Sequence, residues 1–148
     1  MIMLMKYWLI KTEPEEWSWQ QQVKSGNKGA EWSGVRNFQA AKNLREMKIG
    51  DKCFFYHTGK SKSIMGIVVI AKEAFLDKSD KTRKFVSVIV KALYPLKREV
   101  SLKEIKKNKA FRDFSLVKQS RLSVMSVSLK HWKKICKMGR VLYLGVFL

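Results

Sequence analysis

Cysteine, histidine and proline are scarce in this sequence, with two of each among 148 residues. Cys53 and Cys136 lack the CxxC spacing of a zinc site and have no histidine cluster beside them, so we expect reduced thiols, no metal site and no cofactor. No apolar run is long enough to span a membrane. The apolar start MIMLMKYWLI is interrupted by Lys6, which does not fit a signal peptide. We therefore expect a cytoplasmic protein, or a nuclear one if the source is eukaryotic.

Acidic residues are also few, because 12 Asp and Glu stand against 31 Lys and Arg and leave a net charge of +19. The excess is uneven: the segment from Lys97 to Arg140 has 14 basic residues and three acidic ones. An AT-rich genome would explain the preference for lysine over arginine but not the shortage of acids. The charge predicts a polyanionic partner, and we expect nucleic acid.

Catalytic signatures are missing as well. The sequence has no HxE with PCxxC of a deaminase, no glycine loop that would cradle phosphate, and no nucleophile elbow. Glu13, Glu31 and His57 carry acid–base groups, but nothing in their spacing demands a catalytic site. We therefore expect a binding protein and not an enzyme.

The apolar pattern predicts one α+β domain, which is consistent with a chain of this length. Short β-branched and aromatic runs predict strands at Lys6–Lys11, Lys52–Thr58, Ile64–Phe75 and Lys84–Leu96. Capping residues before apolar residues at helical spacing predict helices that begin after Ser18, near Asn37, after Ser101 and after Ser128. Three successive strands in the middle favour a largely antiparallel, curled sheet with helices around it.

Three segments need separate predictions. The helix near Asn37 is expected to have Phe38 on its apolar face and to end at Gly50. Residues 114–124 show no helical stripe, so we expect a loop with a strand edge. The apolar tail, residues 140–148, is too short to span a bilayer and is expected to add a strand, cover an apolar patch or form an oligomer contact.

Four segments carry a family resemblance, in order and spacing: KYWLIKTEPEEWSW, EWSGVRNFQAAKNLREMKIGDKCFFYHTG, IMGIVVIAKEAF and LVKQSRLSV. Together they resemble the EVE domain family of the PUA-like superfamily, which includes the thymocyte nuclear proteins of eukaryotes. The resemblance covers residues 5–139. It implies a small, strongly curved, barrel-like sheet with helices at its ends, and a module that binds a modified base such as 5-methylcytosine after the base has been flipped out of its strand.

The stretch WSGVRN, residues 32–37, supplies the first candidates for a base pocket. Trp32 is either a stacking platform or an ordinary core tryptophan. Gly34 allows close approach of a ligand or makes a turn, with Val35 beside it. Arg36 reaches a phosphate, stacks on a base or is a solvated surface residue. Asn37 can pair with a base edge, although a helix N-cap would look the same in sequence.

Further candidates follow from the resemblance. Lys11 and Thr12 match the start of the family's Lys-Ser-Glu-Pro motif, with threonine in place of serine. Tyr56 and His57 match its Phe-Tyr-His signature and are expected to line the pocket wall. Phe85 stands where the family often has tryptophan, and it would stack less extensively on a base.

The motif Lys118, Gln119, Ser120, Arg121 matches the family's Arg-Gln-Ser-Arg. The resemblance implies that Lys118, Ser120 and Arg121 contact the phosphate backbone. Lysine in place of the first arginine keeps the charge but loses a bidentate donor pair.

These observations predict a reader domain that recognises a modified base in DNA or RNA. Basic side chains would supply affinity, and an aromatic pocket would supply selectivity. Two alternatives stay open: an RNA-binding module of the same fold that ignores modification, and a nuclease or RNA-processing enzyme.

Overall fold

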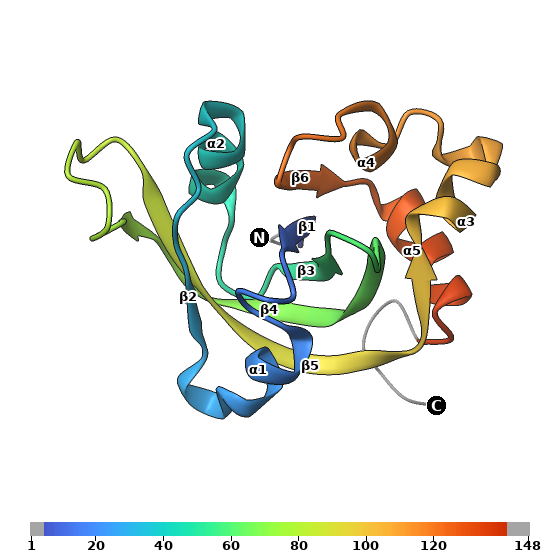
Figure 1. Cartoon of the computed structure of the whole chain (residues 1–148), viewed down its shortest axis with the longest axis horizontal. Helices are drawn as coiled ribbons and strands as arrows, with labels where there is room; N and C mark the ends of the chain where they lie inside the picture. Colours follow the sequence, from blue (N-terminus) through green and yellow to red (C-terminus); the bar gives the residue numbers. More distant parts are fainter. Residues whose placement is uncertain (1–4, 142–148) are drawn as a thin grey trace.

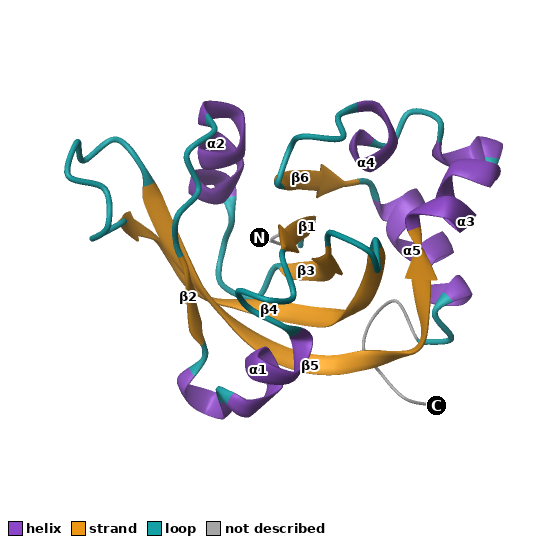
Figure 2. Cartoon of the chain, in the orientation of Figure 1, coloured by secondary structure: helices purple, strands orange, loops and turns teal. Residues whose placement is uncertain are grey.

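The computed structural model describes residues 5–141, which form one curved sheet with helices packed around it (Figures 1 and 2). The strands are β1 (Tyr7–Thr12), β2 (Ala30–Trp32), β3 (Lys52–His57), β4 (Ser63–Leu76), β5 (Val86–Ser101) and β6 (Val124–Val127). Their order in the sheet is β2-β5-β4-β3-β1-β6. All neighbouring strands are antiparallel except β1 and β3, which are parallel. The α+β class and the curved sheet expected from the sequence are confirmed.

The curvature comes from the two longest strands, β4 and β5, whose pairing shifts register at four points. Such irregularities bend a strand and increase its local twist. Gly66 lies at one of these points, opposite Pro95, and a Cβ on Gly66 would lie 2.4 Å from ring atoms of Trp19. Glycine is therefore required for the indole to pack against the bent strand.

The helices are α1 (Trp19–Lys24), α2 (Phe38–Glu46), α3 (Leu102–Lys107), α4 (Ser115–Lys118) and α5 (Leu129–Met138). The predicted N-caps are confirmed at Ser18, Asn37, Ser101 and Ser128, and both capping boxes are formed. The core beneath them is aromatic: Trp132 of α5 stacks on Phe54 of β3, with ring centroids 3.8 Å apart. No helix in residues 5–141 is long and apolar enough to cross a membrane.

Several expected boundaries and faces were wrong. Helix α2 ends at Glu46, not Gly50, because Met47 is already extended. Phe38 is 67% exposed and not on the buried face, which Ala40, Ala41 and Leu44 form instead. Strand β5 continues past Leu96 to Ser101. The segment 114–124, expected to be a loop with a strand edge, contains α4 and reaches the start of β6 at Val124. Strand β2 was not predicted. The prediction for the tail lies mostly outside the described residues.

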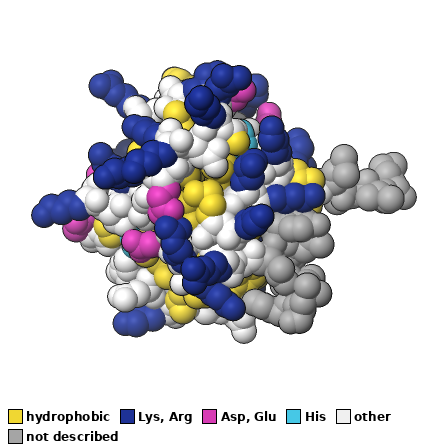
Figure 3. Space-filling view, turned by 90° about the vertical axis from the view of Figure 1, so that its right-hand side faces the viewer, with side chains coloured by type: hydrophobic (Ala, Val, Ile, Leu, Met, Phe, Trp, Pro, Cys, Tyr) yellow, Lys and Arg dark blue, Asp and Glu magenta, His cyan; other side chains and the backbone are white. Residues whose placement is uncertain are grey.

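Charge is spread unevenly over the surface. Figure 3 views the molecule from the side on which α3 lies, and Lys and Arg side chains are scattered across that face with few acidic ones between them. The described residues form three salt bridges, so most of the basic side chains are not paired with a carboxylate.

Candidate functional site

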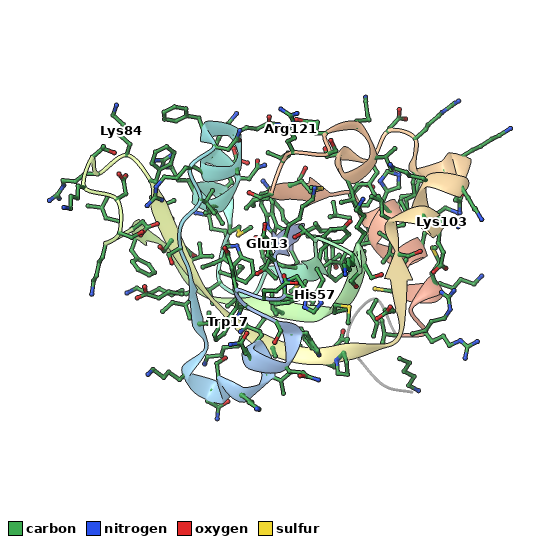
Figure 4. All side chains as sticks on the ribbon, in the orientation of Figure 1. Glu13, Trp17, His57, Lys84, Lys103 and Arg121 are labelled. Atoms are coloured by element: carbon green, nitrogen blue, oxygen red, sulfur yellow. The ribbon has the colours of Figure 1, made fainter. Side chains whose placement is uncertain are left out.

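A cavity of about 620 Å³ lies where the chain leaves β1 and β2 and meets the loop after α4. This volume falls in the range of ordinary ligand pockets. We call it the main cavity, and four stretches of chain line it: residues 11–13, 16 and 17; residues 31–36; Thr58; and residues 120, 121 and 123. Figure 4 marks Glu13 and Trp17 from the first stretch and Arg121 from the last.

Trp32 and Trp17 give the main cavity two aromatic surfaces. Trp32 is 7% exposed, and its ring meets the edge of Phe55 at 5.6 Å between centroids. It is therefore both a core residue and part of the cavity lining, and Val35 is buried to the same extent beside it. Trp17 is partly buried, and its Nε1 donates to Gln22 Oε1 at 2.8 Å. Sequence reasoning did not single out Trp17, although it lies inside the quoted motif.

Gly34 and Arg36 are held by one carboxylate, that of Asp77. Gly34 has a φ of +81°, and its backbone N–H donates to Asp77 Oδ2 at 2.8 Å. Arg36 Nη1 donates to the same oxygen at 3.0 Å, and Nη2 donates to Ser79 Oγ at 3.0 Å. Burial of Asp77 would raise its pKa, but hydrogen bonds from Ser79, Gly34 and Arg36 hold the pKa well below its usual range. Arg36 is thus a fixed part of the wall, not a freely solvated side chain.

Phe85 does not line the main cavity, and its stacking on a base stays a prediction. Its ring stacks on Phe38 with centroids 5.1 Å apart, and the Arg36 guanidinium lies over it at 5.3 Å from the centroid. Phe85 therefore packs against the Arg36 guanidinium and helps to hold it in the wall of the main cavity.

Asn37 is a helix cap, since its Oδ1 accepts from the Ala40 N–H at 2.9 Å. Its side chain borders a smaller hollow of about 320 Å³ together with Lys118 and Arg121. This hollow shares Ser120 and Arg121 with the main cavity. The three residues expected to contact phosphate, Lys118, Ser120 and Arg121, are therefore brought together at the rim.

Lys11 and Thr12 hold the end of β1 at the main cavity. Lys11 Nζ donates to the Ser120 carbonyl at 2.9 Å, which ties the end of β1 to the loop after α4. Burial lowers the pKa of Lys11. The hydroxyl of Thr12 donates to the Trp17 carbonyl at 2.9 Å, so threonine performs a task that serine could also perform.

Tyr56 and His57 do not line the main cavity, so their place in the wall of a base pocket stays a prediction. Tyr56 borders an adjoining hollow of about 220 Å³ behind Lys11, and burial raises its pKa to about 12. His57 Nε2 accepts from the Trp19 N–H at 3.0 Å and so anchors the start of α1. Burial lowers the pKa of His57, and Glu99 and Glu15 oppose that shift.

Carboxylates form the least expected part of the lining. Glu13, Glu16 and Glu31 border the main cavity of a chain with a charge of +19. An ionised carboxylate only accepts hydrogen bonds, so the cavity offers acceptors beside two aromatic surfaces and cations at its rim. In the described part of the chain, no three His, Cys, Asp or Glu side chains are placed to hold a metal ion.

Comparisons with known proteins give consistent matches over this whole fold. The thymocyte nuclear protein 1 of Danio rerio is 31% identical over 163 residues, covering 85% of this chain and 68% of that protein. A solved protein of Rhodopseudomonas palustris is 46% identical with a TM-score of 0.87, over 91% of this chain and 93% of the other. Human THYN1, solved in complex with DNA containing 5-methylcytosine, is 28% identical with a TM-score of 0.81, over 90% and 97% of the two chains. The EVE domain model matches residues 6–138, and the chain belongs to the EVE domain family.

Proposed function

We propose that this chain is a non-enzymatic reader that binds nucleic acid and recognises a modified base, 5-methylcytosine or a derivative, flipped into the main cavity. The observation that carries the proposal is the pairing of Trp17 and Trp32 with carboxylates in one cavity of about 620 Å³. Extracting a base from a strand costs a few kcal/mol. Stacking on an aromatic side chain returns about 1 to 3 kcal/mol, so two tryptophans offset the cost where one barely would.

The carboxylates supply a reason for preferring cytosine. The N4 amino group of cytosine donates hydrogen bonds, and Glu is a suitable acceptor for it, whereas thymine presents an oxygen at the same position. Glu13, Glu16 and Glu31 line the cavity that would receive this edge. The apolar side chain of Val35 offers a surface for a methyl group on the base.

The residues at the rim of the main cavity supply affinity that does not depend on the nucleotide sequence. Lys118, Ser120 and Arg121 lie together between the main cavity and the hollow beside it, where phosphates on either side of an extruded base would pass. The human relative solved with methylated DNA supports the choice of DNA as the first substrate to test.

The test is fluorescence polarisation on matched short DNA and RNA strands, each unmodified or with one 5-methylcytosine, 5-hydroxymethylcytosine or N6-methyladenine. The wild type is compared with Trp17→Ala, Trp32→Phe and the control Ile49→Ala, which removes an exposed apolar side chain outside the main cavity. We expect the wild type to prefer one modified strand. Trp17→Ala should weaken binding of that strand by about 5- to 100-fold and bring it toward the unmodified level.

The variants are chosen so that a loss of binding can be distinguished from a loss of folding. Trp32 is buried, so its replacement by phenylalanine preserves an aromatic core residue, while Trp17 is less buried and can be truncated. Equal binding of all strands by the wild type and by Trp17→Ala would contradict the reader function. It would favour an RNA- or DNA-binding module without modification specificity.

A further inference from the structure

A second concave surface, which we call the lysine groove, lies away from the main cavity. It has a volume of about 590 Å³ and is formed by the turn between β3 and β4 and by α3. Five of its eight lining residues are lysines: Lys60, Lys62, Lys103, Lys106 and Lys107. All five side chains are exposed.

The two walls of the lysine groove are locked together. The Lys62 carbonyl accepts from the Leu102 N–H at 2.8 Å, and Ser63 pairs with Ser101 where β4 meets β5. Lys62 has a φ of +43°, a left-handed conformation that is uncommon for a residue with a side chain. Such conformations cost free energy and persist where the surrounding contacts impose them. The lysines are thus presented from a rigid frame and not from a loose loop.

The charge of the lysine groove is uncompensated. The one acid of α3, Glu104, accepts from Arg98 Nη2 at 2.7 Å and completes the helix cap at Ser101. The hydrogen bond from Arg98 lowers the pKa of Glu104, which keeps it ionised in that role. None of the five lysines forms a salt bridge with a described residue. Five ammonium groups around one hollow repel each other unless an anion binds between them.

The lysine groove adjoins the hollow behind Lys11, which in turn adjoins the main cavity. That hollow shares Lys11, Thr58 and Ser120 with the main cavity. It shares Lys62, Leu102 and Lys106 with the lysine groove. Three adjoining hollows therefore lie in a row between the tryptophans and the lysines.

We propose that the lysine groove holds the sugar-phosphate backbone of the same strand whose base occupies the main cavity. The inference rests on the proposed function and extends it: the binding site spans several nucleotides and lengthens to one side of the recognised base. The proposed occupant is a single strand, because its flexible backbone can follow three adjoining hollows, whereas a duplex is too stiff to bend along them. Lysine ammonium groups bind phosphates as point charges without reading sequence.

The experiment uses single-stranded DNA with one 5-methylcytosine, as a five-nucleotide strand and as two strands extended by eight nucleotides on the 5′ or the 3′ side. The test variant is Lys103→Gln/Lys106→Gln/Lys107→Gln. The control is Lys78→Gln/Lys81→Gln/Lys84→Gln, which removes the same charge from the exposed segment between β4 and β5. Figure 4 marks Lys84 and Lys103 at opposite ends of the molecule.

We expect the wild type to gain affinity from extension on one side only. The groove variant should lose most of that gain, about tenfold or more near 0.1 M salt, and its salt slope should fall by about 2, as for three lost phosphate contacts on a single strand. The control variant should keep the one-sided gain.

The proposal is overturned if extension gives no gain on either side, or if both triple variants lose affinity equally, because the loss would then reflect net charge alone. The preference for 5-methylcytosine is measured separately, as the ratio of the affinities for the five-nucleotide strands with 5-methylcytosine and with cytosine. If the wild type lacks that preference, the reader function fails. A one-sided gain that the groove variant abolishes would still support the lysine groove as the path of the strand.

Discussion

His57 illustrates how a residue that matches a family motif can also have a structural task. Its Nε2 must be unprotonated to accept from the Trp19 N–H, and its ring lies edge-on to Phe55 at 5.7 Å between centroids. Burial lowers its pKa, which favours the same neutral form. The residue therefore holds the start of α1, and the neighbouring Trp17, in place by remaining neutral.

This role predicts a loss of stability in mild acid. The folded pKa of His57 lies below the unfolded value near 6.5, so the unfolded chain takes up the proton first as pH falls. The contribution of His57 is full above about pH 6.5 and decreases below it. We expect the urea midpoint of the wild type to fall between pH 7.5 and 5. His57→Gln should cost about 1 kcal/mol at pH 7.5 and depend less on pH over this interval. Equal pH dependence in both proteins would contradict this role.

At the level of single residues, the sequence identified the short motif at residues 32–36 that helps to line the main cavity. It did not identify the other residues of the lining. Trp32, Gly34 and Arg36 were found because they occupy one short unusual stretch. Glu13 and Glu31 were considered only as acid–base groups, and Glu16 not at all, because a carboxylate gives no local sign in the sequence that it borders a cavity. Four separated stretches converge there, and only long-range pairing of the strands brings them together.

For helices and strands, capping residues in the sequence predicted the structure better than hydrophobic periodicity did. Ser18 and Ser101, each followed three residues later by Gln or Glu, marked helix starts that the structure confirms. Strand β2 has three residues and exists only because it pairs with Val88–Val90 of β5, so no periodicity could show it. Helix α4 has four residues and no side-chain cap, which leaves no signal to distinguish it from a loop.

The segment between β4 and β5, residues 77–85, holds the wall of the main cavity in place. Asp77 binds Gly34 and Arg36, while Asp80 accepts from the N–H groups of Thr82, Lys84 and Phe85 within the segment. The hydrogen bond from the Thr82 hydroxyl leads the contacts that lower the pKa of Asp80 to about 2. Asp77 thus joins the segment to the cavity, and Asp80 shapes the segment alone.

We predict that Asp77→Asn lowers the free energy of unfolding by about 2 kcal/mol at pH 7, because the bonds to Gly34 and Arg36 lose their charged acceptor. The folded pKa of Asp77 is lower than the unfolded value near 3.8. Its contribution is therefore present above about pH 4 and lost as pH falls below it, so the variant should show a flatter acid dependence. The measurement is urea unfolding at pH 7, 5 and 3.

Asp80→Asn is the matched control for the contacts of Asp77 with Gly34 and Arg36. It disturbs the same segment without touching the groups that line the main cavity. We expect Asp77→Asn to reduce the preference for a modified base and Asp80→Asn to leave it intact. An equal effect of both variants on that preference would mean that the segment acts through general stability and not through Arg36.

For the whole molecule, the placement of the few acids matters more than their number. Four acids accept hydrogen bonds from backbone N–H groups, from the Trp8 indole or from an arginine: Asp51, Asp77, Asp80 and Glu104. Three glutamates line the main cavity. Few carboxylates remain to neutralise 31 basic residues. The outer surface is therefore attractive to a polyanion, while the lining of the main cavity balances its three glutamates against Lys11, Arg36 and Arg121.

This separation predicts that salt changes affinity without changing selectivity. Phosphate contacts release counterions, so the affinity for a single strand should fall with a log–log salt slope of about −0.7 per contact, near −3 to −4 for five contacts. Stacking and hydrogen bonds inside the main cavity displace few ions, so the ratio of affinities for modified and plain strands should stay constant from 50 to 300 mM salt. Fluorescence polarisation titrations at five salt concentrations measure both quantities. A selectivity ratio that collapses along with affinity would mean that phosphate contacts, and not the main cavity, distinguish the strands.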